Sequence, residues 1–295
     1  LNLLALILAL WYFRGVLSLA AVSSSEAVDQ LPALLDEYPD RAEGLEKWTL
    51  IRWPNKTVPI LKDNIYPPFD NATAYLHTVT CVRIEDKFSE GGKFYVKMDA
   101  SQCLSHVGYN LNLLAYQELD LGPHCYERLG NIFHGLYHTL GILHPQNRPD
   151  RDDYIFVNLS NIEKKYHNIL EKTPGYYGFL STMGLPYDYA SVMHLAEDGF
   201  RTSGMRALAP WSLLYSSHST RSKAWHDSTV EETVGSGLVL TLLKYFPGTV
   251  GQRMYPSRGD LALLNRFYEC WDYYLGDDIP GAIPYKLWHA KYLTP

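Results

Sequence analysis

The chain has 295 residues, of which 46% are hydrophobic, and a formal net charge of -6 at pH 7. This supply of apolar residues is enough for one sizeable core, or for two lobes around a cleft. Charges of neither sign form a long run, and no basic patch is present to neutralise phosphates. The composition therefore predicts that nucleic acid is not a partner.

Residues 1–22 are almost wholly apolar, with Arg14 as the only charge, and small residues precede Ala21. This pattern predicts a signal peptide; an uncleaved signal-anchor is the alternative, because the run approaches membrane-spanning length. No other stretch is long enough to span a bilayer. The chain is therefore predicted to be secreted and extracellular, without a stable membrane span after maturation. Residues 23–49, polar and acidic, are predicted to form a short pro-segment.

Four cysteines stand at positions 81, 103, 125 and 270. Secretion would place them in an oxidising compartment, where an even number favours disulfides. Unpaired cytosolic thiols are the alternative. Four cysteines can pair in three ways, and the spacing of these four does not choose among them.

After the pro-segment, the first predicted elements are a strand over 57–61 and a short helix. Asp70 would N-cap that helix, which would run to about Val79. Alternation predicts a further strand over 93–98, and the stretch 107–121 holds one or two more.

A helix is predicted over residues 129–140, and it carries the most informative spacing in the chain. His134 and His138 are four residues apart, so they lie on one helical face. Gly141 can end the helix in a left-handed conformation, which would bring His144 toward the same point. Three imidazoles with a fourth position open make a zinc site of catalytic type. The alternative is two ordinary helix histidines, one buried and one exposed.

The spacing H-x-x-x-H-x-x-G-x-x-H resembles the metzincin pattern. HPQNRPDRDDYI after the third histidine, PYDYASVMH (186–194) and RWPNKTVPI (52–60) are similar to segments of the astacin family. The resemblance covers about residues 50–270. It implies an α+β fold with a twisted N-terminal sheet, a zinc helix, a less regular C-terminal lobe and an extended cleft between them that binds peptide or protein.

The resemblance also implies particular roles for residues of this chain. One Zn²⁺ per chain would be held by His134, His138 and His144, and Met193 would be the methionine of the turn beneath the metal. Cys81 would pair with Cys270, and Cys103 with Cys125. Residues 211–250 separate two segments that the family keeps close together, so they are expected to be an insertion, and 271–295 to be a C-terminal tail. Three N-x-S/T sequons predict glycosylation at Asn55, Asn71 and Asn158.

Three residues depart from the family pattern. Gly135 stands where the general-base glutamate is expected, and Leu195 stands where a tyrosine would hydrogen-bond the developing oxyanion. Pro145 replaces the glutamate that holds the mature N-terminus. These differences predict a secreted zinc-binding metalloendopeptidase homologue that is catalytically impaired or inactive, without catalytic residues of its own.

Two alternatives remain open on the sequence. The first is an active zinc endopeptidase with a substitute base, for which Glu118 and Glu127 are candidates because they precede the helix. The second is a metal-free secreted interaction glycoprotein. Zinc content and a peptidase assay separate the three hypotheses.

Overall fold

The computed structural model describes residues 41–62, 66–87, 95–110, 113, 115–196, 200, 208–210 and 250–293. The expected signal peptide, residues 23–40 of the expected pro-segment and all but the last residue of the expected insertion lie outside this part of the chain.

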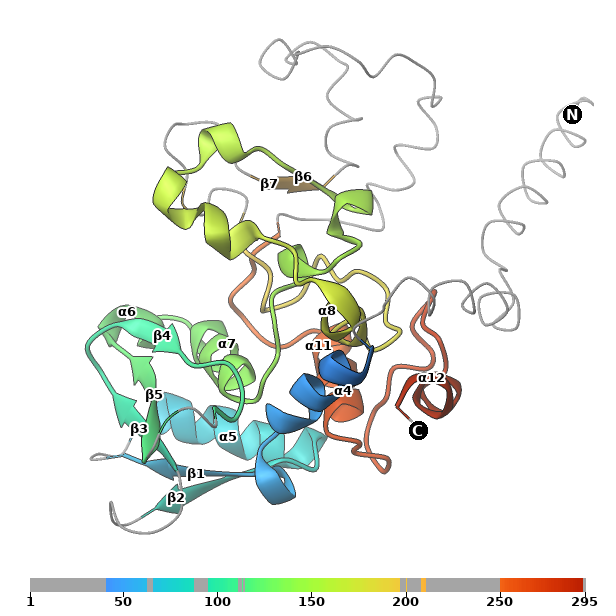
Figure 1. Ribbon diagram of the computed structural model, residues 1–295. Coiled ribbons are helices and arrows are strands. Elements are labelled where there is room, and N and C mark those ends of the chain that lie inside the picture. Colours follow the sequence, from blue (N-terminus) through green and yellow to red (C-terminus); the bar gives the residue numbers. More distant parts are fainter. Residues whose placement is uncertain are drawn as a thin grey trace, which may run out of the picture.

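A mixed five-stranded sheet forms the N-terminal lobe, in the order β2-β1-β3-β5-β4 (Figure 1). Neighbouring strands are parallel except at the edge, where β4 runs antiparallel to β5. The strand predicted over 57–61 is confirmed, and the one predicted over 93–98 is described from residue 95. The strands are β1 (Thr57–Leu61), β2 (Arg83–Lys87), β3 (Tyr95–Asp99), β4 (Cys103–Ser105) and β5 (Tyr116–Leu121).

Three helices accompany the sheet: α5 (Pro67–Val79), α6 (Pro123–Tyr126) and α7 (Leu129–Thr139). The prediction that Asp70 caps α5 is wrong, because the N-cap is Tyr66, four residues earlier. Proline is well suited to the first helical turn, where its missing N–H would have no partner anyway. Asp70 instead forms an ion pair with Lys62. Helix α7 packs against α5 and against strands β4 and β5, so the sheet supports the histidine helix directly.

The C-terminal lobe is less regular, as expected. It contains the two-stranded sheet of β6 (Ile155–Val157) and β7 (Leu208–Pro210), and helix α8 (Gly175–Leu180). Short 3-10 helices connect these elements, at Pro145–Asn147, Arg151–Asp153, Leu159–Asn161 and Lys164–Leu170, and another at Pro54–Lys56 precedes β1. A small apolar cluster of its own fills this lobe: Ile155, Ile162, Leu170, Tyr187 and Leu208.

Helices from both ends of the described chain pack into the main core: α4 (Arg41–Leu50), α11 (Arg258–Phe267) and α12 (Tyr285–Tyr292) (Figure 1). Trp48 on α4 is 2% exposed, and its ring centroid lies 4.5 Å from that of Phe267. Trp288 on α12 is 1% exposed. The core therefore includes residues beyond both ends of the span 50–270, because Trp48 and Trp288 are buried in the core.

Two disulfides tie the elements together. Cys81, after α5, pairs with Cys270, after α11, and Cys103 in β4 pairs with Cys125 in α6. This is the pairing that the resemblance implies. The first joins the N-terminal lobe to the C-terminal helices, and the second tethers the edge strand. Among the described residues, no helix has both the length and the apolar character needed to cross a membrane.

Candidate metal centre

Helix α7 ends in the turn that the histidine spacing requires. Gly141 has φ +93°, a left-handed conformation that favours glycine, and its N–H donates to the carbonyl of His138 at 2.8 Å. A Cβ at this position would lie 2.9 Å from the ring of Phe267, so the close packing also requires glycine. The turn carries the chain back past the helix and places His144 opposite His134 and His138.

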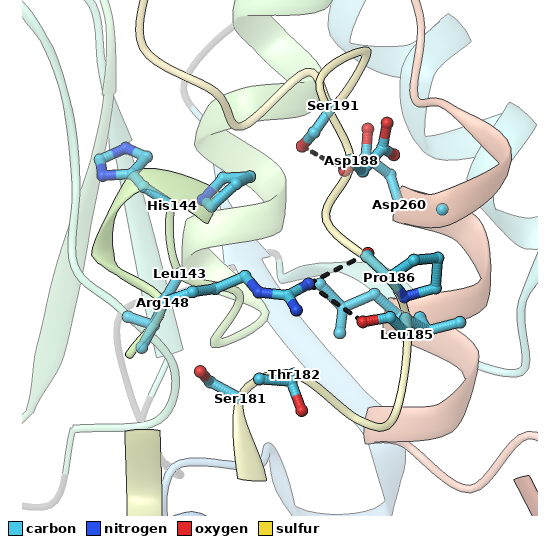
Figure 2. A pocket seen from close by; sticks show the side chains of 13 residues that line it. Leu143, His144, Arg148, Ser181, Thr182, Leu185, Pro186, Asp188, Ser191 and Asp260 are labelled. Atoms are coloured by element: carbon cyan, nitrogen blue, oxygen red, sulfur yellow. Dashed lines mark hydrogen bonds between the residues drawn. The ribbon is translucent and has the colours of Figure 1, made fainter. Parts of the chain in front are cut away.

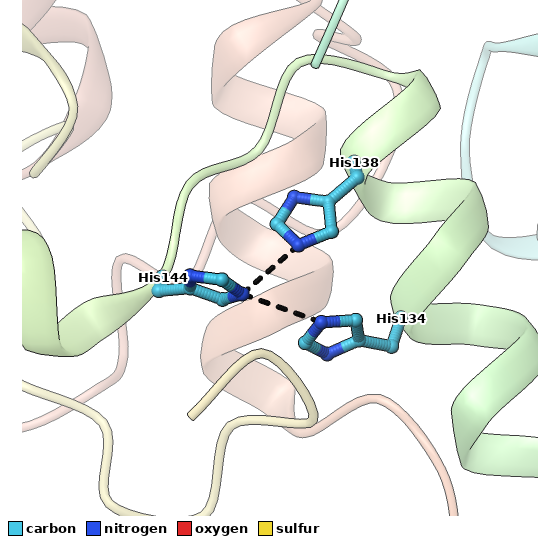
Figure 3. A group of neighbouring side chains, drawn as sticks. All are labelled: His134, His138 and His144. Carbon is cyan, nitrogen blue, oxygen red and sulfur yellow. Dashed lines mark hydrogen bonds between the residues drawn. The ribbon is translucent and has the colours of Figure 1, made fainter. Parts of the chain in front are cut away.

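The three Nε2 atoms face one another (Figure 3). Nε2 of His144 lies 2.9 Å from Nε2 of His138 and 3.3 Å from that of His134. A tetrahedral zinc with Zn–N bonds of about 2.0–2.1 Å separates its nitrogen ligands by about 3.3 Å. The triangle of nitrogen atoms therefore has the dimensions of one shared metal ion.

The outer nitrogens of two of these rings show which tautomer they adopt. Nδ1 of His134 lies 3.0 Å from the carbonyl of Val192, and Nδ1 of His138 lies 3.0 Å from that of Ile142. A carbonyl only accepts hydrogen bonds, so each Nδ1 carries the proton and each Nε2 presents a lone pair. Lone pairs directed at one point repel each other unless a cation lies between them. The donor set therefore fits a metal.

Burial keeps the imidazoles neutral, as a metal ligand must be. It lowers the pKa of His138 to about 4. Burial and the neighbouring His138 and Arg253 hold the pKa of His134 well below its ordinary value, and burial and the other two imidazoles do the same for His144. At neutral pH all three rings are therefore uncharged, and each keeps one ring nitrogen free for coordination.

The turn over residues 191–194 supports the centre from below. Met193 is fully buried, and the carbonyl of Val192 contacts His134. His194 is held as a neutral ring: Nδ1 donates to the carbonyl of Leu195 at 2.8 Å, and Nε2 accepts from the hydroxyl of Tyr187 at 2.7 Å. Burial lowers the pKa of His194 to about 4.

Gly135 is buried against strand β5. A Cβ there would lie 3.1 Å from Cδ1 of Leu119 and 3.2 Å from Cδ2 of Leu121, so only methyl groups at the ends of flexible side chains would have to yield. The described residues form one histidine cluster able to hold a metal, and no carboxylate belongs to it.

Neither candidate for a substitute base joins this cluster. Glu118 is exposed and alternates along β5 with Leu119 and Leu121, which face α7, so its side chain points to the opposite side of the sheet. Glu127 is exposed at the C-cap of α6, before α7 begins.

The other two departures from the family pattern lie near the third histidine. Leu195 packs against the apolar cluster of the C-terminal lobe, and its N–H donates to Oε1 of Gln146 at 3.1 Å. Pro145 lines a small cavity that His144 also lines.

Two carboxylates, Asp188 and Asp260, line the same cavity, and the sequence reasoning missed both (Figure 2). Ser257 and Asp260 form a reciprocal capping box at the start of α11. The serine–aspartate spacing signals such a helix start, and nothing in it indicates proximity to the histidines.

A helix backed by a sheet, with three histidines whose Nε2 atoms converge on one point, is an arrangement that could hold one metal ion, as the centres of zinc peptidases do. The sequence model of the Astacin peptidase family matches residues 45–218. The chain therefore belongs to the astacin family, as the histidine spacing and the turn segment predict.

Known relatives agree with this assignment. Protein SpAN from Strongylocentrotus purpuratus is 27% identical over 260 residues, which cover 83% of this chain and 36% of that protein. Astacin-like metalloprotease toxin 2 from Loxosceles intermedia is 31% identical over 179 residues, 57% of this chain and 66% of that one. The chain thus spans only about a third of the length of SpAN.

The fold has a solved counterpart. High choriolytic enzyme 1, a hatching enzyme zinc-protease from Oryzias latipes, superposes with a TM-score of 0.54 at 22% identity, covering 74% of this chain and 93% of the other. This similarity confirms the astacin-like α+β architecture.

Proposed function

We propose that this chain is a secreted astacin-family homologue that binds one Zn²⁺ through His134, His138 and His144 and hydrolyses peptide bonds poorly or not at all. The observation that carries the proposal is Gly135: within the part of the chain that the structure describes, no carboxylate joins the three histidines. The three imidazoles are neutral, half-buried and correctly spaced, so loss of the carboxylate does not entail loss of the metal.

A bound zinc ion would act as a Lewis acid and lower the pKa of a coordinated water. Within the chain, the Nε2 atoms of the three histidines would hold the ion, and the carbonyls of Val192 and Ile142 orient two of the rings. A positioned general base accelerates such reactions by about 10²–10⁴. Gly135 has no side chain to accept the proton, and Leu195 has no donor for a developing oxyanion.

Peptide or protein would bind beside this centre. Strand β4 lies at the edge of the sheet, and α7 packs against it. An extended peptide can add to such an edge through backbone hydrogen bonds, and this mode of binding needs no catalytic group. We therefore favour peptide or protein binding as the use of the fold.

Secretion is supported by the apolar N-terminus and by the two disulfides. We also propose glycans on the sequons. Asn55 and Asn71 are exposed, whereas Asn158 is half-buried and its side chain accepts the N–H of Ser160 at 3.0 Å.

The test combines zinc content with restoration of the missing groups. The double variant Gly135→Glu, Leu195→Tyr is compared with Gly135→Gln, Leu195→Tyr, which matches it in shape and lacks the base. We expect one zinc per chain in all proteins. Chelator-sensitive peptide hydrolysis should be about 10²–10⁴-fold faster in the glutamate variant than in the glutamine control.

Two results would contradict the proposal. Hydrolysis by the unmodified chain at the rate of the glutamate variant would favour an active enzyme with a substitute base. Protein that binds no zinc when zinc is supplied, and whose melting temperature is unaffected by chelator, would favour the metal-free glycoprotein.

A further inference from the structure

One chain of hydrogen bonds leads from the metal centre to a buried carboxylate. Nδ1 of His134 donates to the carbonyl of Val192 at 3.0 Å. This carbonyl shares its peptide bond with the N–H of Met193, and that N–H donates to Oγ of Ser191 at 3.0 Å. The Ser191 hydroxyl donates to Oδ1 of Asp260 at 2.6 Å (Figure 2). In this series of three hydrogen bonds, each donor lies on the side of the imidazole and each acceptor on the side of the carboxylate.

We propose that Asp260 is a positioning residue for His134. Through Ser191 and the Val192–Met193 peptide, it fixes the ring in the tautomer that leaves Nε2 free, and it stabilises the positive charge that the ring acquires when Nε2 binds a cation. The inference rests on the metal site proposed above. Histidine ligands commonly donate their second N–H to a carboxylate or a carbonyl. Here the carbonyl is the direct partner and the carboxylate acts through it, because aligned hydrogen bonds polarise one another.

The carboxylate of Asp260 is built into its place. The residue is 2% exposed on α11. Besides the Ser191 hydroxyl, it accepts the N–H of Val192 at 2.8 Å and that of Ser257 at 2.9 Å. Three donors converge on its two oxygens, which is the environment of an ionised carboxylate. Burial and the nearby Asp188 raise its pKa to about 6, so it remains ionised at neutral pH.

A cation on the other side of the same carbonyl explains why an anion is needed. Nη1 of Arg253 donates to the carbonyl of Val192 at 2.9 Å and to that of His194 at 3.0 Å. Its positive charge contributes to lowering the pKa of His134, and it would likewise oppose a bound metal ion. The charge of Asp260 offsets it, since Asp260 raises the pKa of Arg253 against the effect of burial.

The neighbouring Asp188 provides a control for the hydrogen bonds. It lines the same cavity, and burial raises the pKa of its carboxyl as it does that of Asp260. Its carboxylate accepts the N–H of Ala190 at 2.9 Å and the hydroxyl of Ser257, so it stands outside the chain of bonds that leads to His134.

The experiment uses the full chain and four variants: Ser191→Ala, Ser191→Thr, Asp260→Asn and Asp188→Asn. Zinc dissociation constants are measured by chelator competition, and the Nδ1 proton of His134 is followed by NMR in the metal-free protein. Ser191→Ala and Asp260→Asn should weaken zinc binding about 10–100-fold. They should also shift the Nδ1 proton upfield and speed its exchange with solvent. Ser191→Thr, which keeps the hydroxyl, should retain the unmodified dissociation constant and spectrum. Asp188→Asn should not weaken zinc binding, because it leaves the hydrogen bonds to Asp260 in place and removing its charge favours the ionised form of Asp260.

Ser191→Ala decides the matter, because Asp260 also caps α11 and its replacement disturbs the helix. A folded Ser191→Ala protein with unchanged zinc affinity and an unchanged Nδ1 resonance overturns the inference. If the unmodified chain binds no zinc, the proposed function fails, and the Nδ1 resonance of Ser191→Ala still tests whether the carboxylate positions His134.

Discussion

Acid should destabilise the metal-free protein, and the buried histidines set the size of the effect. Burial lowers the pKa of His138 and of His194 from 6.5 to about 4. The unfolded chain therefore binds more protons than the native one between these values, and the free energy of unfolding falls as the pH falls through this window. At pH 5 each of these two histidines lowers the free energy of unfolding by about 2 kcal/mol relative to pH 8.

Asp260 acts in the opposite direction. Its pKa is raised from 3.8 to about 6, so its contribution to stability is present at low pH and is lost as the pH rises through that range. Between pH 8 and pH 5, Asp260 therefore raises the free energy of unfolding by about 1 kcal/mol. The three groups together predict a net loss of about 2–3 kcal/mol, and the lowered pKa values of His134 and His144 add to it.

Urea unfolding in chelator at pH 8 and pH 5 measures this loss. The variant His194→Gln is the control: it removes one titrating ring that is not a proposed ligand, and the loss between the two pH values should shrink by about 2 kcal/mol. An unfolding free energy that is constant or rises from pH 8 to pH 5 would refute the assignment of neutral, buried imidazoles.

Three further predictions concern the scaffold. Trp48→Ala should lower the free energy of unfolding by about 3–5 kcal/mol in a denaturant titration, because the ring is buried in the core; a loss below about 1 kcal/mol would show that α4 is dispensable. Replacing Cys81 and Cys270 together by alanine should cost about 5 kcal/mol in the same assay, since this disulfide closes a loop with a sequence separation of 189; unchanged stability would contradict the chain-entropy estimate. Mass spectrometry of the secreted protein should find a glycan on the exposed Asn71 more often than on Asn158, whose side chain caps a 3-10 helix; the reverse order would show that access does not decide occupancy.

Local patterns predicted the clustering of the three histidines well because its geometry is local. His134, His138, Gly141 and His144 lie within eleven residues, and helical periodicity and the freedom of glycine determine how they converge. The helix start predicted at Asp70 was wrong, because the prolines at 67 and 68 occupy the first helical turn, where their missing N–H groups need no partner.

Long-range packing was beyond the sequence. Nothing local to Trp288 indicates that it packs into the main core, or that Asp260 meets Ser191 from 69 residues away. These contacts depend on how the C-terminal helices return to the histidine helix, and tertiary packing alone decides that. The hydrogen-bonded chain behind His134 was therefore visible only in the structure.

The central claim is that this chain keeps the metal and has lost the chemistry. The most direct test is hydrolysis of casein by the unmodified protein loaded with one equivalent of zinc, measured beside His138→Ala under the same conditions. We predict that the unmodified protein hydrolyses casein at or little above the rate of His138→Ala, and at least about 10²-fold more slowly than Gly135→Glu, Leu195→Tyr. Hydrolysis by the unmodified chain at the rate of that double variant, abolished by chelator and absent from His138→Ala, would contradict the account.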